Sequence, residues 1–369
     1  MRILVTGANG FISRNLTSHL GEHEDVDVVR FTRNDSPEDL FKIVKRVDAV
    51  VHLAGVNRPV NDAEFVEGNH KLTDILCQSL SVTGRKIPVI FTSSIQAELD
   101  NPYGISKHAA EEALSHYSKE TGSNVYVYRL ANVFGKWCRP NYNSVVATFS
   151  HNIANDLPIQ INNPDTELNL VYIDDVIEEF IGVLCFSEKS SAPDISPLYS
   201  IKLGELAEQL QTFRKSRKSL TIGAIGAGLT RALYATYLSY LKPEQFSYDL
   251  LKHEDERGVF AEVLKTRDSG QLSFFTAHPG ITRGGHYHHT KNEKFLVVSG
   301  SAKFRFRHII TGEKYSIDVN GGFPEVVETV PGWTHSITNT GDSEMVVMLW
   351  ANEIYDKNNP DTYVDEIDE

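Results

Sequence analysis

Three polar side chains in the first third of the chain have types and a spacing suited to proton transfer. Tyr103 and Lys107 lie four residues apart, so they share one face of a helix predicted from Asn101 to about Thr121. A lysine ammonium beside a phenol favours the phenolate and lowers the pKa of the phenol, so we expect Tyr103 to exchange a proton with a substrate oxygen near neutral pH. Ser94, which ends an apolar run, would hold the same oxygen by a hydrogen bond. The alternative is an exposed tyrosine beside a solvated lysine.

The start of the chain predicts an anion site. Arg2–Thr6 has the composition of a buried parallel strand, Gly7 and Gly10 follow at once, and an amphipathic helix comes next. The N-terminus of such a helix attracts a pyrophosphate, and glycine lets it approach the backbone. A T-G-x-x-G turn in this place indicates a dinucleotide cofactor, the alternative being a strand–helix turn that needs glycine sterically. Ser13 stands where a third glycine is expected.

The end of the next predicted strand, Asp27–Phe31, bears on the choice of cofactor. In a dinucleotide fold this strand end meets the adenosine ribose, where an acidic residue binds the 2′-hydroxyl of NAD. Here the position carries Arg33, with Arg30 nearby, so the sequence favours the 2′-phosphate of NADP and therefore NADPH. A solvated surface arginine is the alternative.

Strand and helix signals alternate along this part of the chain. The predicted buried strands are Arg2–Thr6, Asp27–Phe31, Asp48–Ala54 and Ile87–Thr92. Such alternation is typical of an α/β fold with a doubly wound parallel sheet. Ligands of such a sheet bind beyond the carboxyl ends of the strands, where the sequence places Gly7, Arg33, Gly55 and Ser94.

The composition shifts after Pro243. Helical patterns run from Leu203 to Lys242, whereas the rest of the chain has short β-rich runs, frequent glycine and few helix signals, as in Gly270–Ala277 and Ala302–Ile309. Regular short strands predict an antiparallel sandwich or barrel. We therefore expect an α/β domain over residues 1–243 and an all-β domain over residues 244–369.

Four side chains of the second domain have the spacing of a metal site. His286 and His288 alternate along a predicted strand and so point the same way. With Glu293 and His335 they would form a three-histidine, one-carboxylate site for a divalent metal such as zinc, manganese, iron or nickel. The alternative is a metal-free site whose histidines hydrogen-bond a substrate.

The motifs of the first domain together resemble the extended short-chain dehydrogenase/reductase family of nucleotide-sugar enzymes, whose fold is an NAD(P)-binding Rossmann domain. They are T-G-A-N-G-F-I at Thr6–Ile12, H-L-A-G at His52–Gly55, F-T-S-S at Phe91–Ser94, Y-G-I-S-K at Tyr103–Lys107, R-L-A-N-V-F-G at Arg129–Gly135 and V-Y-I-D-D-V at Val171–Val176. The resemblance covers about Met1 to Leu241. The segment between Ser94 and Tyr103 departs from it by being shorter than usual.

This resemblance implies roles for individual residues. The catalytic set would be Ser94, Tyr103 and Lys107. The cofactor would be bound by Gly7, Asn9, Gly10, Phe11, Ile12, Arg33, Leu53, Ala54, Gly55, Tyr103 and Lys107. The substrate would be bound by Asn57, Arg58, Ser94, Asn132, Arg139, Asn141 and Asn143, with Arg129 near the nicotinamide.

The second domain resembles the cupin family, whose fold is a small jelly-roll barrel. Gly280, His286, His288, Glu293 and Gly300 have the spacing of one cupin signature, and Pro331 to Asn339, with His335, that of the other. The segments D-E-R-G-V-F-A-E at 255–262 and R-G-G-H at 283–286 also resemble dTDP-4-dehydrorhamnose 3,5-epimerases, which are metal-independent cupins. In those enzymes the histidine of the second motif removes a proton next to a ketone. His286 is therefore either a metal ligand or a general base.

The two domains together resemble a family of bifunctional capsular polysaccharide enzymes. This resemblance implies C3 epimerisation of a UDP-4-keto-6-deoxy-N-acetylhexosamine by the cupin, then NADPH-dependent C4 reduction to UDP-2-acetamido-2,6-dideoxy-talose. That product is a precursor of UDP-N-acetyl-L-fucosamine for capsule or O-antigen. The resemblance also implies a homodimer and zinc. The alternatives are a single-function 4-ketosugar reductase with a structural cupin, a non-catalytic sugar-nucleotide sensor, and a metal-dependent oxygenase.

Composition limits the partners and the compartment. A formal net charge of −13 argues against nucleic acid or an anionic membrane as the main partner. The three cysteines are far apart and form no C-x-x-C, which favours a reduced, cytoplasmic protein without a disulfide framework. No apolar run is long enough to span a bilayer, and no signal peptide is expected before the first strand.

Overall fold

The computed structural model describes residues 1–185, 194–358, 360–365 and 367. It divides into two compact units: the first comprises Met1–Gln211 and Gly226–Leu241, and the second comprises Thr212–Ile225 and Lys242–Glu369. The segment Thr212–Ile225 belongs to the second unit because β9 (Thr221–Ile222) pairs with β11 (Gly258–Thr266). The expected boundary near residue 243 did not include this strand, which lies inside a stretch with a helical pattern.

A five-stranded parallel sheet is the centre of the first unit. Its strand order is β2-β1-β3-β4-β5, and the strands are β1 (Arg2–Thr6), β2 (Asp27–Phe31), β3 (Ala49–His52), β4 (Val89–Ser94) and β5 (Val125–Leu130). The order reverses between β1 and β3, which is where a doubly wound sheet opens a crevice for its ligand. The T-G-x-x-G turn follows β1 directly, so it lies at this point of the sheet.

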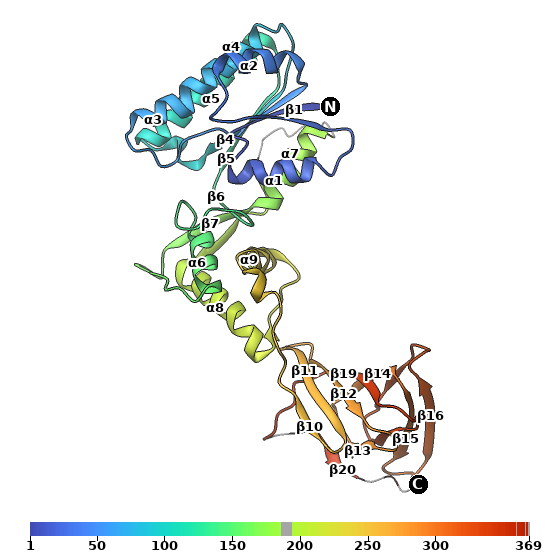
Figure 1. The fold of residues 1–369 in the computed structure, drawn as a ribbon. Helices are drawn as coiled ribbons and strands as arrows, with labels where there is room; N and C mark the ends of the chain where they lie inside the picture. The colour runs from blue at the N-terminus through green and yellow to red at the C-terminus, as the bar shows by residue number, and fades with distance from the viewer. Residues whose placement is uncertain (186–193, 359, 366, 368–369) are drawn as a thin grey trace. The chain divides into compact units, whose positions relative to one another are not determined.

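Helices cover both faces of the sheet (Figure 1). Figure 1 shows α2 (Pro37–Ile43), α4 (Leu72–Ser81) and α5 (Pro102–Thr121) on one face and α1 (Phe11–Leu20) and α7 (Ile173–Cys185) on the other. Leucines and aromatic residues from the strands and from α2, α4 and α5 form one buried cluster, which includes Leu40, Leu76, Phe91, Leu114 and Tyr117. Burial of these apolar side chains fixes α5, and with it Tyr103 and Lys107, against the sheet.

The rest of the first unit is smaller. A three-stranded sheet with the order β6-β7-β8 consists of β6 (Asn132–Phe134), β7 (Glu167–Tyr172) and β8 (Tyr199–Lys202). The remaining helices are α3 (Ala63–Phe65), α6 (Val145–Ala154), α9 (Gly228–Leu238) and α8 (Leu203–Ser219), and the part of α8 from Thr212 on belongs to the second unit. The loop from β6 to α6 supplies one wall of the cleft described below.

The second unit has two antiparallel sheets. The larger has the order β10-β11-β12-β19-β14-β17, and the smaller β16-β15-β18-β13-β20. Beyond β11, the strands are β10 (His253–Asp255), β12 (Gln271–Ala277), β13 (Thr282–Tyr287), β14 (Glu293–Ser299), β15 (Ser301–His308), β16 (Lys314–Asn320), β17 (Val326–Glu328), β18 (Trp333–Asn339), β19 (Met345–Ala351) and β20 (Tyr363–Val364). Buried side chains from both sheets, such as Phe275, Phe295, Phe304 and Ile337, form its core.

The predicted fold class is confirmed: a parallel α/β sheet with helices precedes antiparallel sheets. Cys77 and Cys138 are free and buried, whereas the side chain of Cys185 lies outside the described residues. Within the described ranges, the helices are all too short or too polar to cross a membrane.

Candidate active site and metal centre

The glycine turn after β1 requires glycine at its first position. Gly7 has a φ of +62°, and a Cβ there would lie 2.7 Å from Cα of Ala54, in the loop after β3. The N–H of Gly10 donates to the Gly7 carbonyl at 2.8 Å. Ser13 is buried, and its hydroxyl donates to the same carbonyl at 2.8 Å. The serine therefore does not break the motif, since its hydroxyl adds a hydrogen bond to the turn.

The close approach of Gly7 to β3 gives a first prediction. Gly7→Ala is expected to cost about 1–3 kcal/mol of stability and to weaken binding of the dinucleotide at least tenfold, because the turn must move away from Ala54. Gly84→Ala is the matched control: Gly84 has a φ of +65° but no atom within 4 Å of an added Cβ. Calorimetric titration with NADPH and thermal unfolding of both variants measure the effect. Equal losses in the two variants would contradict a role for the contact itself.

Thr6, the last residue of β1, fixes the loop after β3 through its hydroxyl. That oxygen accepts backbone N–H groups of Leu53 and Ala54 at 3.1 Å each, so its own proton points to Nδ1 of His52 at 2.7 Å. Nε2 of His52 lies 2.9 Å from the Thr73 hydroxyl. Burial, with the charge of Lys107, lowers the pKa of His52 to about 3, so the ring is neutral at physiological pH. His52 is thus a buried bridge between strand and helix.

Asn69 joins the same loop to the helix that carries Tyr103. Asn69 lies in a π-helical turn, Val66–Lys71, of a kind that is frequent at functional sites. Its side-chain oxygen accepts the Val56 N–H at 2.8 Å, and its side-chain nitrogen donates to the Ser106 hydroxyl at 2.9 Å. Ser106 in turn donates to the Tyr103 carbonyl at 2.7 Å. The sequence analysis missed this network, since an isolated asparagine gives no signal without its partners.

The structure brings the three predicted catalytic residues together. Ser94 is the last residue of β4, and Tyr103 and Lys107 lie on the first turns of α5. A 3-10 turn, Ile95–Glu98, fills the short segment between them. Asn101 begins α5 by accepting the Gly104 N–H at 2.8 Å. The shortened segment therefore still returns the chain to the end of β4.

The expected effect of Lys107 on Tyr103 is not found. The ammonium of Lys107 donates to the Thr92 carbonyl at 2.9 Å and lies 4.9 Å from the centre of the Phe91 ring. Burial raises the pKa of Tyr103, and a hydrogen bond with Ser94 opposes this only in part. Burial also lowers the pKa of Lys107 to about 8, against the effect of Glu111. The predicted lowering of the Tyr103 pKa is thus not found in this structure, because burial raises this pKa and the Lys107 ammonium donates to the Thr92 carbonyl instead.

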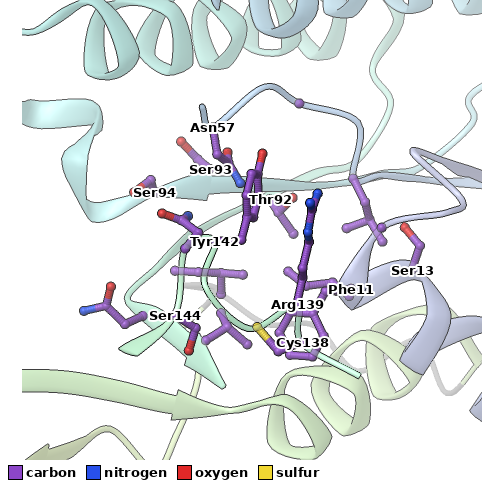
Figure 2. Close-up of a pocket in the computed structure, with 18 of the residues that line it drawn as sticks. Phe11, Ser13, Asn57, Thr92, Ser93, Ser94, Cys138, Arg139, Tyr142 and Ser144 are labelled. Carbon is purple, nitrogen blue, oxygen red and sulfur yellow. The ribbon is translucent and has the colours of Figure 1, made fainter. Parts of the chain in front are cut away.

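These residues line one cleft of about 990 Å³ (Figure 2). Figure 2 shows Ser93 and Ser94 from the end of β4, with Arg139 and Tyr142 from the loop after β6. The predicted site residues that line the cleft are Asn9, Gly10, Phe11, Ile12, Arg33, Leu53, Gly55, Asn57, Ser94, Tyr103, Lys107, Asn132, Arg139 and Asn143. Residues that are predicted to bind cofactor and substrate, from distant parts of the sequence, thus line one cavity.

Other predicted residues lie behind or outside the lining. Gly7 and Ala54 contact each other beneath the turn, as described above. Arg58 reaches the site indirectly, with its guanidinium 5.7 Å from the centre of the Tyr142 ring. Asn141 also lies off the lining, and its N–H donates to Thr148.

Two residues of the cleft region differ from expectation. Arg129 is not part of the lining, because its guanidinium is paired with Glu98 at 2.7 Å and with Glu111 at 2.6 Å. Its expected place near the nicotinamide stays a prediction, and in the structure its ion pairs join β5 to α5. Tyr142 was not among the predicted site residues. Its ring centre lies 5.2 Å from the guanidinium of Arg139, whose positive charge would attract an anionic ligand.

In the second unit, the four predicted metal-site residues form one cluster. One ligand atom from each of His286, His288, Glu293 and His335 can be chosen so that all lie within 4.8 Å of one another. The bulge in β13 between Gly284 and His286 makes this possible, because it lets His286 pair with His335 on β18. The ring centres of His286 and His335 are 4.6 Å apart.

The electrostatics of the cluster suit a cation. Burial disfavours the charge of Glu293, but the contacts of its carboxylate with His288 and His335, at 3.4 Å each, and the charge of Lys291 hold its pKa well below the usual range. Burial and His335 lower the pKa of His286 to about 4, so its ring is neutral at physiological pH. Both ring nitrogens of His335 are buried without a hydrogen-bond partner. Imidazole nitrogens beside an ionised carboxylate are the donor set of a zinc-type ion.

Comparison with known proteins supports the assignment of both units. Residues 3–195 match the NAD dependent epimerase/dehydratase family, and residues 253–363 match the polysaccharide biosynthesis C-terminal domain. The UDP-2-acetamido-2,6-beta-L-arabino-hexul-4-ose reductase of Pseudomonas aeruginosa is 58% identical over 370 residues, which cover 100% of both chains. The crystal structure of the capsular polysaccharide assembling protein CapF from Staphylococcus aureus matches with a TM-score of 0.93 and 44% identity over 100% of both chains. The chain belongs to the CapF group of the NAD dependent epimerase/dehydratase family.

Some solved structures match only part of the chain. The UDP-glucuronic acid 4-epimerase of Bacillus cereus, solved in complex with NAD, has 18% identity and a TM-score of 0.55. It covers 65% of this CapF-group chain and is itself matched over 96% of its length. This likeness shows the fold alone.

Proposed function

We propose that this protein is a bifunctional nucleotide-sugar enzyme, in which the second unit epimerises C3 of a UDP-4-keto-6-deoxy-N-acetylhexosamine and the first unit reduces C4 with NADPH. The product would be UDP-2-acetamido-2,6-dideoxy-talose, a precursor of UDP-N-acetyl-L-fucosamine for capsule or O-antigen. The observation that carries this proposal is the pairing of a Ser94–Tyr103–Lys107 cleft with a buried histidine–carboxylate cluster in one chain. The name of the P. aeruginosa relative supports a 4-keto sugar as the substrate.

The residues of the cleft account for the reduction. NADPH supplies hydride when it is bound at the glycine turn. Tyr103 donates the proton that the carbonyl oxygen of the substrate needs, and its raised pKa keeps it in the protonated form that a reduction requires. Ser94, which contacts Tyr103, orients the same oxygen. Arg139 and Asn143 on the opposite loop would bind the nucleotide part of the substrate.

The second prediction concerns Arg33 and the choice between NADPH and NADH. Arg33 lines the cleft just beyond β2, where the sheet meets the adenosine ribose. Arg33→Ala is expected to raise KM for NADPH about 10- to 100-fold and to leave KM for NADH unchanged, since a charge-assisted hydrogen bond contributes about 1.5–3 kcal/mol. Arg30→Ala is the control, because Arg30 donates to Thr17 and does not line this cleft. A parallel change for both cofactors would contradict recognition of a 2′-phosphate.

The histidine cluster supports the epimerisation. A divalent metal, proposed to be zinc, would be held by His286, His288, Glu293 and His335 and would stabilise the enolate oxygen formed when C3 loses its proton. The convergence of all four side chains favours a ligand role for His286. A role of His286 as general base remains the alternative, and the neutral ring of His286 is suited to both roles.

The test of the proposed function is proton NMR in deuterated water with the 4-keto UDP-sugar and no NADPH. Incorporation of deuterium at C3 is the expected result, followed by NADPH oxidation once the cofactor is added. Turnover of NADPH without exchange would instead indicate a single-function reductase with a structural second unit. Absence of both would indicate a sugar-nucleotide sensor.

A homodimer is also part of the proposal, and one face of the second unit supports it. Phe274, Met348, Leu296 and Val326 are register partners in a row across four strands of the larger sheet. Met348 is 39% exposed and Val326 57%. A row of apolar side chains left in water is typical of a surface that a second copy covers. Light scattering of the purified protein measures the mass, and a monomer would contradict this part.

A further inference from the structure

A short strap at the end of the chain lies along the histidine cluster. The strap is Asp361–Asp365, and it contains β20, whose residue Val364 pairs with His286. The N–H of Asp365 donates to the Gly285 carbonyl at 3.0 Å. Figure 1 shows β20 beside β13, near the C-terminus. The strap thus closes the edge of the smaller sheet, next to the strand that supplies His286.

The strap fixes which nitrogen of His288 is free. Nδ1 of His288 lies 2.5 Å from the backbone carbonyl oxygen of Asp361. Because a carbonyl oxygen only accepts, Nδ1 must carry the proton, and in a neutral ring Nε2 then has the lone pair. Nε2 is the nitrogen that lies 3.4 Å from the Glu293 carboxylate. An outer hydrogen bond of this kind orients a metal-binding histidine.

The side chain of Asp361 holds the turn that connects His288 to Glu293. Its carboxylate accepts the backbone N–H groups of His289 at 2.9 Å, Thr290 at 2.7 Å and Lys291 at 2.8 Å. The Thr290 hydroxyl donates to it as well, at 2.9 Å. Four hydrogen bonds to one carboxylate fix the spacing of two cluster residues. They also place Lys291, whose ammonium lies 2.8 Å from the Glu293 carboxylate.

The other end of the strap reaches the strand of the third histidine. The carboxylate of Asp365 accepts hydrogen bonds from the Thr334 hydroxyl and from Arg307. Thr334 directly precedes His335 and is fully buried. Between the two aspartates, the Tyr363 ring stacks on Tyr287, with ring centres 5.3 Å apart. Each histidine of the cluster therefore has a strap contact on itself or on an adjacent residue.

We infer that the strap is the outer shell of the metal centre, with Asp361 as a positioning residue that sets affinity for the divalent ion. This inference rests on the proposed metal centre. Without the Asp361 carboxylate the turn from His288 to Glu293 loses its four hydrogen bonds. The backbone carbonyl of residue 361, which sets the His288 tautomer, then loses the side chain that anchors it to this turn. Part of the free energy of metal binding would then be needed to order the ligands, so the affinity for the metal would fall.

Metal titration of the full chain tests the role of Asp361. Zn²⁺ affinity is measured by competition with a chromophoric chelator, and the visible spectrum of the Co²⁺ form reports ligand geometry. Asp361→Ala is expected to bind Zn²⁺ about 10- to 100-fold more weakly, with an altered Co²⁺ spectrum. Asp356→Ala is the matched control from the same tail, because among the described residues Asp356 accepts a single, local hydrogen bond, from the Asn358 N–H. The control should behave as the wild type.

The outcomes separate this inference from the proposal beneath it. Wild-type affinity and an unchanged spectrum in Asp361→Ala would overturn the role of the strap. Failure of the wild-type protein to bind Zn²⁺ or Co²⁺ would instead overturn the metal centre itself. If Asp361→Ala does not fold, Asp361→Asn decides, since it keeps one acceptor oxygen; it should show a smaller loss, and no loss would refute the inference.

Discussion

Tyr103→Phe should lower kcat for NADPH-dependent reduction of the 4-keto sugar by about 10²- to 10⁴-fold, the contribution of a positioned general acid. Tyr103 lies in the cleft beside Ser94, and its phenol is the proposed proton donor to the reduced carbonyl oxygen. The ring itself packs 5.6 Å from Phe65, a contact that phenylalanine retains. NADPH binding and thermal stability are therefore expected to change little, whereas NADPH oxidation nearly stops.

The same variant separates the two proposed reactions. Because Tyr103 belongs to the first unit and the histidine cluster to the second, Tyr103→Phe should still exchange deuterium into C3 at the wild-type rate. Tyr315→Phe serves as the control, since Tyr315 is 64% exposed on β16 and lies outside the cleft. Wild-type oxidation of NADPH by Tyr103→Phe would remove Tyr103 from the mechanism.

Local sequence signals predicted the elements of the first unit well, because each element there depends on residues that are close together in the sequence. The strand Arg2–Thr6 and the helix ending at Thr121 were predicted at their observed limits. Burial is a property of the folded whole, so the raised pKa of Tyr103 could not be read from its distance to Lys107 along the chain. The same limit explains Arg129, whose carboxylate partners Glu98 and Glu111 come from other elements.

In the second unit, spacing predicted the histidine cluster because strand alternation and a cupin-like pattern both survive in the sequence. The contacts around the cluster could not be predicted, because they follow no pattern in the sequence. Asp361 is one acid in an acidic tail, and only the fold shows that it accepts hydrogen bonds from the turn after His288. The strand β9 could not be predicted for a related reason. A strand of two residues is too short to show the alternation of apolar and polar residues, and its partner β11 lies far away in the sequence.

His335→Gln is the variant expected to affect the second unit most. His335 is 2% exposed, and among the described residues its ring nitrogens make no hydrogen bond beyond the 3.4 Å contact of Nε2 with the Glu293 carboxylate. A side chain of similar length therefore removes a ligand without breaking a strong interaction. Loss of an outer-shell partner alone costs a metal site about 10- to 100-fold in affinity, so loss of a ligand should cost at least about 100-fold. Deuterium exchange at C3 should fall with it, because the enolate oxygen loses its stabilising cation.

The reductase site provides the internal standard for this experiment. With substrate that is already epimerised, His335→Gln should oxidise NADPH at the wild-type rate, the reverse of the pattern expected for Tyr103→Phe. His278→Gln is the control, since His278 is exposed and pairs with Glu344 outside the cluster. Full C3 exchange in metal-free His335→Gln would rule out metal-assisted epimerisation. If His286→Gln were then inactive, the exchange would be assigned to His286 as the general base, in agreement with the metal-independent epimerases that the R-G-G-H segment resembles.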